Sequence, residues 1–265
     1  MANQHVIDRF SRSAESYDGY AKIQEEVGRQ LLTMLDQTTC TAILELGCGT
    51  GNFTSLLAER FAGAEIQAVD ISPAMIRVAA RKLRDRQVTL RVADAETMDL
   101  SGPHDLVAAN ASFHWFQDLP AILPKLARAC GEEGTLLFST FGPETYRELN
   151  ACLRHRWGPG VACVAESFPN RDALEHLLRQ HFREAKVCER THTRPFAGLW
   201  GLLRTIKYTG TQGRSAERPW TRGDVQALEQ AYLARFGSIV ATYQVFYGVA
   251  TGGGQPSDSR VPAPR

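Results

Sequence analysis

The feature that most constrains the fold is a regular alternation of short apolar segments with segments of helical periodicity. Five segments have the length and composition of buried strands, at residues 42–46, 65–70, 88–93, 105–110 and 135–141. Apolar residues at helical spacing follow the first two, and Ser72-Pro73 supplies an N-cap with a proline at the first helical position. This alternation predicts an α/β fold, a parallel sheet with helices on both faces.

After the fifth segment the alternation changes. We expect helices at 143–157 and 170–182, then two strands at 185–192 and 238–249. A long insertion, residues 195–237, separates these strands and contains two further helical patterns. Insertions of this length in a compact domain are usually functional.

The two ends of the chain differ in composition. Residues 14–37 carry helical turns and a longer helical pattern, so we expect residues 1–38 to form a helical cap. Residues 251–265 are rich in Gly, Pro and Ser, and we expect a disordered tail there. Residues 1–250 are then expected to form a single domain.

The charge balance and the cysteines argue against several classes of protein. Lys and Arg total 30 against 29 for Asp and Glu, so a net charge of +1 gives no global reason to expect nucleic acid or a membrane as a partner. The six cysteines show no C-x-x-C spacing, and we expect no metal site. The N-terminus lacks the apolar core of a signal peptide. We expect a cytoplasmic protein that acts as a monomer.

A glycine-rich turn connects the first strand to the helix that follows it, in the stretch ILELGCGTGNFTSLL. Its glycines stand at Gly47, Gly49 and Gly51, which allow a ligand to approach the backbone closely. The dinucleotide fingerprint needs its third glycine one position later, and a P-loop needs a Gly-Lys-Ser/Thr that is absent. The spacing therefore favours a nucleoside with a bulky, uncharged linkage.

Two carboxylates extend this site along the same edge of the sheet. Asp70 closes the second strand, about 20 residues beyond the loop, where it can accept hydrogen bonds from both ribose hydroxyls. Asp94 and Ala95 follow the third strand, where they can meet an adenine edge. Open α/β sheets bind ligands at this carboxyl edge, so the three features together indicate one nucleoside site.

With these residues in place, residues 40–141 resemble the cofactor-binding core of the class I S-adenosylmethionine-dependent methyltransferases. The motifs are E-L-G-C-G-T-G, V-D-I-S and A-D-A-E. The resemblance implies a Rossmann-like sheet of seven strands with a reversed hairpin at its edge. It places the methionine end at Glu45 and the Gly47–Gly51 loop with Cys48, the ribose at Asp70 and the adenine at Asp94 and Ala95. It also assigns cofactor contacts to Ile71, Met75 and Asn110.

The acceptor of the methyl group depends on residues after the fourth strand, which continues as N-A-S-F-H-W. The N-P-P-Y motif of many base-modifying enzymes is absent there, and so are the metal-binding carboxylates of catechol-type enzymes. A carboxylate acceptor is already ionised at neutral pH and needs only orientation and desolvation. The small number of candidate bases is compatible with such an acceptor.

A narrower resemblance covers nearly the whole chain to about residue 250. The stretches F-S-R-S-A-E-S-Y-D, N-A-S-F-H-W, F-S-T-F-G-P-E-T-Y-R-E-L and L-L-R-T-I-K-Y-T-G are similar to those of the malonyl-acyl-carrier-protein O-methyltransferases of biotin synthesis. Tyr208 departs from the family pattern in the last stretch. The resemblance implies methylation of the free carboxylate of a malonyl group on acyl carrier protein, or on coenzyme A.

Several residues receive roles on this basis. Tyr17 and Gln24 are expected to cap the cofactor, with Tyr17 near the transferred methyl, and Arg12 to pair with the methionine carboxylate. His114 is expected to hydrogen-bond the acceptor. Residues 195–222 contain five cations and one anion, a net charge of +4. Of these cations, Arg204 and Lys207 share one helical face and are expected to bind the malonyl carboxylate or the acidic carrier protein.

Two alternatives remain open at this point. A small-molecule carboxyl methyltransferase of the trans-aconitate type shares the N-terminal Y-D and the strand-four motif, although F-S-T-F-G and L-L-R-T-I-K argue against it. A non-catalytic assembly factor that binds the cofactor belongs to a different class of function.

Overall fold

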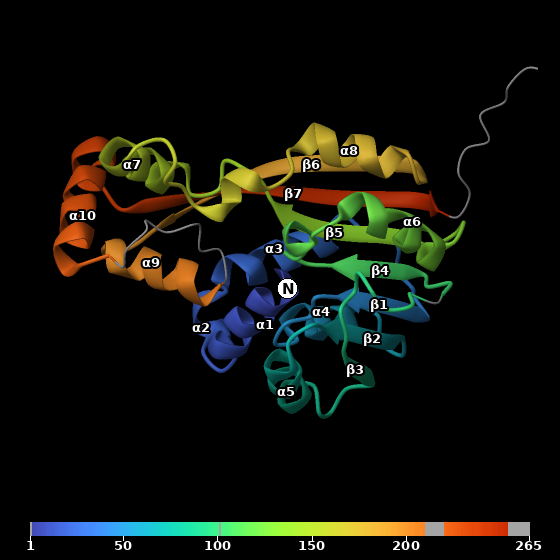
Figure 1. Ribbon diagram of the computed structural model, residues 1–265. Helices are drawn as coiled ribbons and strands as arrows, with labels where there is room; N and C mark the ends of the chain where they lie inside the picture. The colour runs from blue at the N-terminus through green and yellow to red at the C-terminus, as the bar shows by residue number, and fades with distance from the viewer. Residues whose placement is uncertain (1, 101, 210–219, 254–265) are drawn as a thin grey trace, which may run out of the picture.

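The computed structural model describes residues 2–100, 102–209 and 220–253, which form a seven-stranded sheet in the order β3-β2-β1-β4-β5-β7-β6 (Figure 1). The strands are β1 (Ala42–Leu46), β2 (Glu65–Asp70), β3 (Val88–Val92), β4 (Leu106–Ala109), β5 (Thr135–Phe141), β6 (Phe182–Pro195) and β7 (Val240–Gly253). The first five strands pair in parallel, and β7 lies antiparallel between β5 and β6. The predicted Rossmann-like sheet with a reversed edge hairpin is confirmed.

Helices cover both faces of this sheet. The N-terminal and core helices are α1 (Ala2–Ser13), α2 (Tyr17–Tyr20), α3 (Lys22–Leu32), α4 (Asn52–Arg60), α5 (Pro73–Lys82), the 3₁₀ helix η1 (Phe113–Trp115) and α6 (Leu119–Cys130). The later ones are α7 (Arg147–Trp157), the 3₁₀ helix η2 (Val164–Ser167), α8 (Arg171–Arg179), α9 (Leu199–Tyr208) and α10 (Arg222–Phe236). In the described ranges, none of these helices has the length and apolar character of a membrane span.

The core consists of two apolar layers on either side of the central strands. Helices α3 and α4 contribute to one layer, and α6 and α8 contribute to the other. Strands β4 and β5 are buried at every position, as parallel strands covered on both faces require. This burial fixes the strand ends that carry the functional loops.

The hairpin of β6 and β7 is longer than the rest of the sheet. Each strand has 14 residues, and in Figure 1 both extend beyond β5 toward α9 and α10. Helix α10 packs against α7 and α9 there. The insertion between the last two strands therefore forms a helical layer beside the N-terminal helices, because α9 also contacts α1 and α2.

The structure moves the expected C-terminal boundary of the folded domain from residue 250 to residue 253. Strand β7 continues to Gly253, so residues 251–253 belong to the sheet and not to a disordered tail; residues 254–265 lie outside the described part. Helix α1 lies within the expected helical cap of residues 1–38, ahead of the segment 14–37 in which a helical pattern was recognised. Its sequence carries few apolar residues, and its contacts with α5 and α9 supply the packing that a local pattern does not reveal.

Candidate active site

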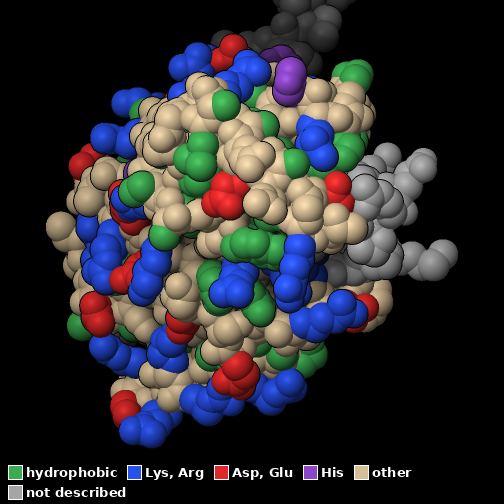
Figure 2. Space-filling view, turned by 90° about the vertical axis from the view of Figure 1, so that its left-hand side faces the viewer, with side chains coloured by type: hydrophobic (Ala, Val, Ile, Leu, Met, Phe, Trp, Pro, Cys, Tyr) green, Lys and Arg blue, Asp and Glu red, His purple; other side chains and the backbone are tan. Residues whose placement is uncertain are grey.

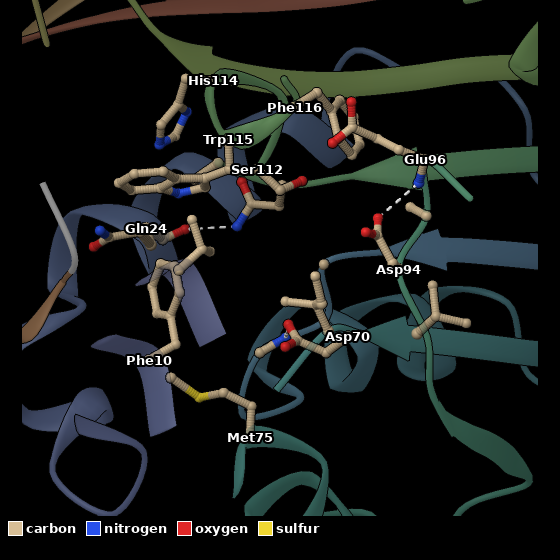
Figure 3. A pocket seen from close by; sticks show the side chains of 18 of the residues that line it. Phe10, Gln24, Asp70, Met75, Asp94, Glu96, Ser112, His114, Trp115 and Phe116 are labelled. Atoms are coloured by element: carbon tan, nitrogen blue, oxygen red, sulfur yellow. Dashed lines mark hydrogen bonds between the residues drawn. The ribbon is translucent and has the colours of Figure 1, made fainter. Parts of the chain in front are cut away.

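A pocket lies where the carboxyl ends of β1, β2, β3 and β4 meet the N-terminal helices (Figure 3). From the sheet, it is lined by Gly47, Gly49, Asp70, Asp94 and Asn110, among others. From the N-terminal helices, it is lined by Val6 and Phe10 of α1, Tyr17 of α2 and Gln24 of α3. A smaller adjoining pocket shares the loop glycines and includes Glu45 and Cys48. Ligand-binding loops at this edge are what the parallel topology requires.

The glycine loop owes its shape to left-handed backbone at its glycines. Gly47 has φ +70° and Gly49 has φ +56°, values that favour glycine. A Cβ on Gly47 would lie 2.8 Å from the Cβ of Ser112, whereas a Cβ on Gly49 would meet nothing within 4 Å. Gly47 therefore allows close packing of the loop, and Gly49 leaves space for a ligand beside the backbone.

Asp70 is held at the mouth of this loop by two backbone donors. Its Oδ2 accepts from the Gly49 N–H at 2.9 Å, and its Oδ1 accepts from the Ser72 N–H at 2.8 Å. Burial raises the pKa of Asp70 to about 6, against the lowering effect of these two hydrogen bonds. The carboxylate is fixed in orientation with lone pairs left over, which suits a partner with two adjacent hydroxyl groups.

Glu45 and Gln24 provide unsatisfied acceptors at the other end of the loop. Glu45 Oε2 and Gln24 Oε1 are buried and have no hydrogen-bond partner among the residues that the structure describes. Burial raises the pKa of Glu45 to about 8, with a contribution from the nearby Asp70 carboxylate and an opposing one from Thr54. A buried acceptor without a donor is costly, so these two atoms fit a ligand that brings an ammonium group.

The loop after β3 closes the opposite end of the pocket. Asp94 Oδ1 accepts from the Glu96 N–H at 3.0 Å, as Figure 3 shows. Glu96 Oε1 accepts in turn from the N–H groups of Gln117 and Asp118, each at 2.9 Å. Ala95 and Phe116 supply apolar surface beside these groups, so this end of the pocket can take a flat ring with a polar edge.

The N-terminal helices are tied to the loop by a network around Asp18. Its Oδ1 accepts from the Thr50 hydroxyl and from Asn52 Nδ2, at 2.5 and 3.0 Å. Its Oδ2 pairs with Lys82 Nζ at 2.8 Å. The donors shift the pKa of Asp18 downward, although partial burial acts against them. Helix α2, and Tyr17 with it, is thereby held over the pocket.

His114 stands above the pocket beside Trp115 (Figure 3). Its Nδ1 lies 3.2 Å from Thr140 Oγ1 and accepts from the Phe141 N–H at 3.5 Å. Because a backbone N–H can only donate, the ring proton resides on Nε2. Burial lowers the pKa of His114 to about 3, so the ring is neutral near pH 7 and acts as a hydrogen-bond donor.

Asn110 and Ala111 shape the end of β4. Asn110 Nδ2 donates to the Gln24 carbonyl oxygen at 2.9 Å, and its Oδ1 accepts from the Ser139 hydroxyl at 2.7 Å. Ala111 has φ +50°, an uncommon value for a residue other than glycine. Its N–H donates to the same Ser139 hydroxyl at 2.8 Å. This network joins the strand end to α3 below the pocket.

The structure brings most of the predicted site residues together. Those that line the pocket or its smaller neighbour are Tyr17, Gln24, Glu45, Gly47, Cys48, Gly49, Asp70, Ile71, Met75, Asp94, Ala95, Asn110 and His114. Their roles toward a ligand stay predictions.

Four predicted residues line neither pocket. Gly51 precedes α4 with φ +83°, and a Cβ there would lie 2.9 Å from Leu83 Cδ1, so its role is in packing. Arg12, Arg204 and Lys207 have exposed side chains outside the pocket. For Arg204 and Lys207, binding of the malonyl carboxylate or of the carrier protein stays a prediction, and their exposure favours the carrier protein. Three further charged residues of the insertion, Arg214, Glu217 and Arg218, lie outside the described residues.

Sequence reasoning missed two residues that line the pocket, Phe10 and Thr209, and a cation that lies next to the lining, Arg9. Phe10 packs edge-to-face on Trp115, with ring centroids 5.5 Å apart. The Arg9 guanidinium lies 6.0 Å from the centre of the Trp115 ring, and burial lowers the pKa of Arg9. Thr209, at the end of α9, reaches the pocket from the insertion. The F-S-R-S-A-E-S-Y-D motif already contained Phe10, but its helical context was not apparent from the local sequence.

Comparison with known proteins agrees with this geometry. A family model described as a methyltransferase domain matches residues 43–134. Among solved structures, a protein from Bacillus halodurans matches with a TM-score of 0.61 at 16% identity, over 86% of this chain and 100% of that one. A phosphoethanolamine N-methyltransferase 2 of Haemonchus contortus, in complex with S-adenosylhomocysteine, matches with a TM-score of 0.58 at 14% identity, over 92% of this chain and 59% of that one. These structural matches show the fold.

Curated relatives give the narrower family. The malonyl-[acyl-carrier protein] O-methyltransferase of Bacillus cytotoxicus is 43% identical over 260 residues, which cover 93% of this chain and 91% of the relative. The enzyme of the same name from Priestia megaterium is 33% identical over 233 residues, covering 82% and 85%. At this identity and coverage, the chain belongs to the malonyl-[acyl-carrier protein] O-methyltransferase family.

Proposed function

We propose that this protein transfers a methyl group from S-adenosylmethionine to the free carboxylate of malonyl-acyl carrier protein, as a step of biotin synthesis. The products are the malonyl methyl ester and S-adenosylhomocysteine. The observation that carries this proposal is the state of His114 on the acceptor side of the pocket, where the ring is neutral and a poor base. A carboxylate acceptor has no proton to lose, so it needs a donor to orient it and no base to activate it.

The pocket residues fit S-adenosylmethionine from one end to the other. Glu45 and Gln24 supply acceptors for its ammonium group, Asp70 supplies acceptors for the ribose hydroxyls, and Asp94 with Ala95 forms the adenine end. When bound, this cofactor supplies an electrophilic methyl group on a sulfonium, which the acceptor carboxylate takes in line with the breaking bond. Tyr17 covers this region from α2 and excludes water from it.

One side chain that lines the pocket is suited to orient the acceptor carboxylate, and a cation lies next to the pocket lining. The neutral His114 ring presents its Nε2–H, and its orientation is fixed by Thr140 and Phe141 of β5. Arg9 does not line the pocket, but its guanidinium lies over the ring of Trp115, which does, and adds a positive charge in a partly desolvated place. His114 would orient the carboxylate, and the positive charge of Arg9 would favour its binding nearby, with no acid or base required.

The proposal extends to the partner, the metal requirement and the location. The malonyl group is delivered on acyl carrier protein, and no metal is needed, because an ionised acceptor requires no Lewis acid to lose a proton. We also propose that the protein works in the cytoplasm as a monomer.

The test is methyl transfer with defined acceptors. The protein is incubated with labelled S-adenosylmethionine and malonyl-acyl carrier protein, and the product is checked for an ester that base cleaves. Acetyl-acyl carrier protein, which has no free carboxylate, is the matched control substrate, and trans-aconitate tests the small-molecule alternative. Tight binding of S-adenosylhomocysteine with no transfer to malonyl thioester would refute the proposal and favour a non-catalytic role.

A further inference from the structure

Helix α9 presents two faces of opposite character. Leu199, Leu202 and Ile206 are buried in the core of the insertion. On the opposite side, Trp200, Arg204 and Lys207 follow one another at spacings of four and three residues and are all exposed. Such spacings place side chains in one row along a helix. We call these three residues the α9 row.

The α9 row combines an exposed indole with two cations that have no carboxylate partner among the described residues. The Trp200 side chain is 51% exposed. Helix α9 contains no acidic residue, and Arg204 and Lys207 form no ion pair with the residues of the described ranges. Figure 2 looks onto the side where α9 and α10 lie and shows Lys and Arg spread around exposed hydrophobic side chains. Trp and Arg are the residue types that dominate binding interfaces.

The C-terminal end of the same helix enters the candidate active site. Thr209, directly after α9, is buried and lines the pocket. Tyr208 stacks on Tyr20 of α2, with ring centroids 4.5 Å apart. At a rise of about 1.5 Å per residue, Trp200 lies about 14 Å along the helix axis from Thr209. A partner seated on the α9 row would therefore need a long, flexible arm to bring its reacting group to the pocket.

We infer that the α9 row is the docking surface for the acidic face of the acyl carrier protein, whose phosphopantetheine arm passes the end of α9 at Thr209 to reach the pocket. This inference rests on the proposed function and names the surface that serves it. The partner's negative charge complements Arg204 and Lys207, and its apolar side chains cover Trp200. The two cations bind the carrier protein itself, while the malonyl carboxylate is bound inside the pocket by other groups.

The test reverses the charge of the row. The double variant Arg204→Glu, Lys207→Glu is compared with Lys186→Glu, Arg190→Glu, which removes two exposed cations from strand β6, away from the pocket lining. We measure KM for malonyl-acyl carrier protein, direct binding of the carrier protein by calorimetry, and the affinity for S-adenosylhomocysteine. The α9 variant should raise KM and weaken carrier binding at least about tenfold, since charge reversal at an interface produces repulsion.

Cofactor affinity separates docking from misfolding. It should stay within about twofold of wild type in both double variants, because neither pair lines the cofactor end of the pocket. Trp200→Ala should also weaken carrier binding, and added salt should raise KM for the wild type more than for the α9 variant. Unchanged KM and carrier binding in the α9 variant, or equal losses in the β6 control, would overturn the inference.

The experiment also distinguishes failure of the docking surface from failure of the proposed function. If the wild type transfers no methyl group but binds carrier protein through the α9 row, the reaction is wrong and the surface stands. If the wild type methylates malonyl-acyl carrier protein and the α9 variant does so equally well, the surface is wrong and the reaction stands.

Discussion

The substitution Glu45→Gln tests whether the buried carboxyl group of Glu45 lowers the stability of the protein when no ligand is bound. Glu45 is 1% exposed, and burial raises its pKa from the ordinary 4.5 to about 8. An unfolded chain releases this proton near pH 4.5, whereas the folded protein keeps it until about pH 8. The free energy of unfolding therefore falls as pH rises from 4.5 through about 8, and the loss is complete above that range.

The size of the effect follows from the two pKa values. At pH 7, a folded-state pKa of about 8 against 4.5 corresponds to about 3 kcal/mol of lost stability. Glutamine has nearly the same shape and carries no charge. We therefore expect Glu45→Gln to be up to about 3 kcal/mol more stable than wild type at pH 7 and nearly equal at pH 4.5.

The assay is urea unfolding of both proteins at pH 4.5, 6, 7 and 8. Glu133→Gln, which removes the charge of an exposed glutamate in a turn, is the control and should show no such pH dependence. With S-adenosylhomocysteine present, the advantage of Glu45→Gln should shrink by about 2 kcal/mol, because loss of a charged partner weakens binding about 30-fold. Equal stability of wild type and Glu45→Gln at pH 7 would contradict the reasoning about desolvation, whatever the effect on binding.

Three further predictions concern the glycine loop after β1, His114 on the acceptor side of the pocket, and the attachment of helix α2 to that loop. Gly47→Ala should reduce stability by about 2 kcal/mol, because it combines a positive φ with a Cβ 2.8 Å from Ser112, and thermal unfolding measures this. His114→Ala should lower kcat at least about tenfold, and the wild-type pH profile should show no histidine limb near 6.5, since burial lowers the pKa of His114 to about 3. Asp18→Asn should weaken the contact between α2 and the loop, so that limited proteolysis cuts the N-terminal segment faster.

Each of these predictions has a contrasting measurement. Gly63→Ala also places alanine at a positive φ, +91°, but with nothing within 4 Å, so it should cost less than Gly47→Ala. A wild-type kcat that rises through pH 6.5 and loses this rise in His114→Ala would contradict the neutral-histidine assignment. Proteolysis of Asp18→Asn at the wild-type rate would mean that the Asp18 contacts do not hold helix α2 on the glycine loop.

The cofactor side of the site was predictable because its residues sit at fixed positions relative to periodic strands. Gly47, Asp70 and Asp94 each stand at or just after the carboxyl end of a strand, and strand order then brings them to one pocket. Left-handed backbone at the loop glycines was likewise implied by the residue type.

The acceptor side was harder to predict because it depends on contacts between distant segments. Arg204 and Lys207 share a helical face, as expected, but spacing does not tell which face points to the pocket. The buried face is set by Leu202 and Ile206, which turns the two cations outward. Arg9 reaches Trp115 only through helix α1, which forms through contacts far away in the sequence.

The stack of Tyr20 on Tyr208 joins the helix beside the candidate active site to the helix that carries the proposed docking surface. Tyr20 belongs to the helix that holds Tyr17 over the cofactor end, and Tyr208 belongs to the helix of the α9 row. Thermodynamic linkage requires that any change in cofactor affinity caused by the carrier protein be matched by an equal change in carrier affinity caused by the cofactor. Carrier affinity measured with and without S-adenosylhomocysteine gives this coupling free energy, and its loss in Tyr208→Ala would show that the ring pair transmits it.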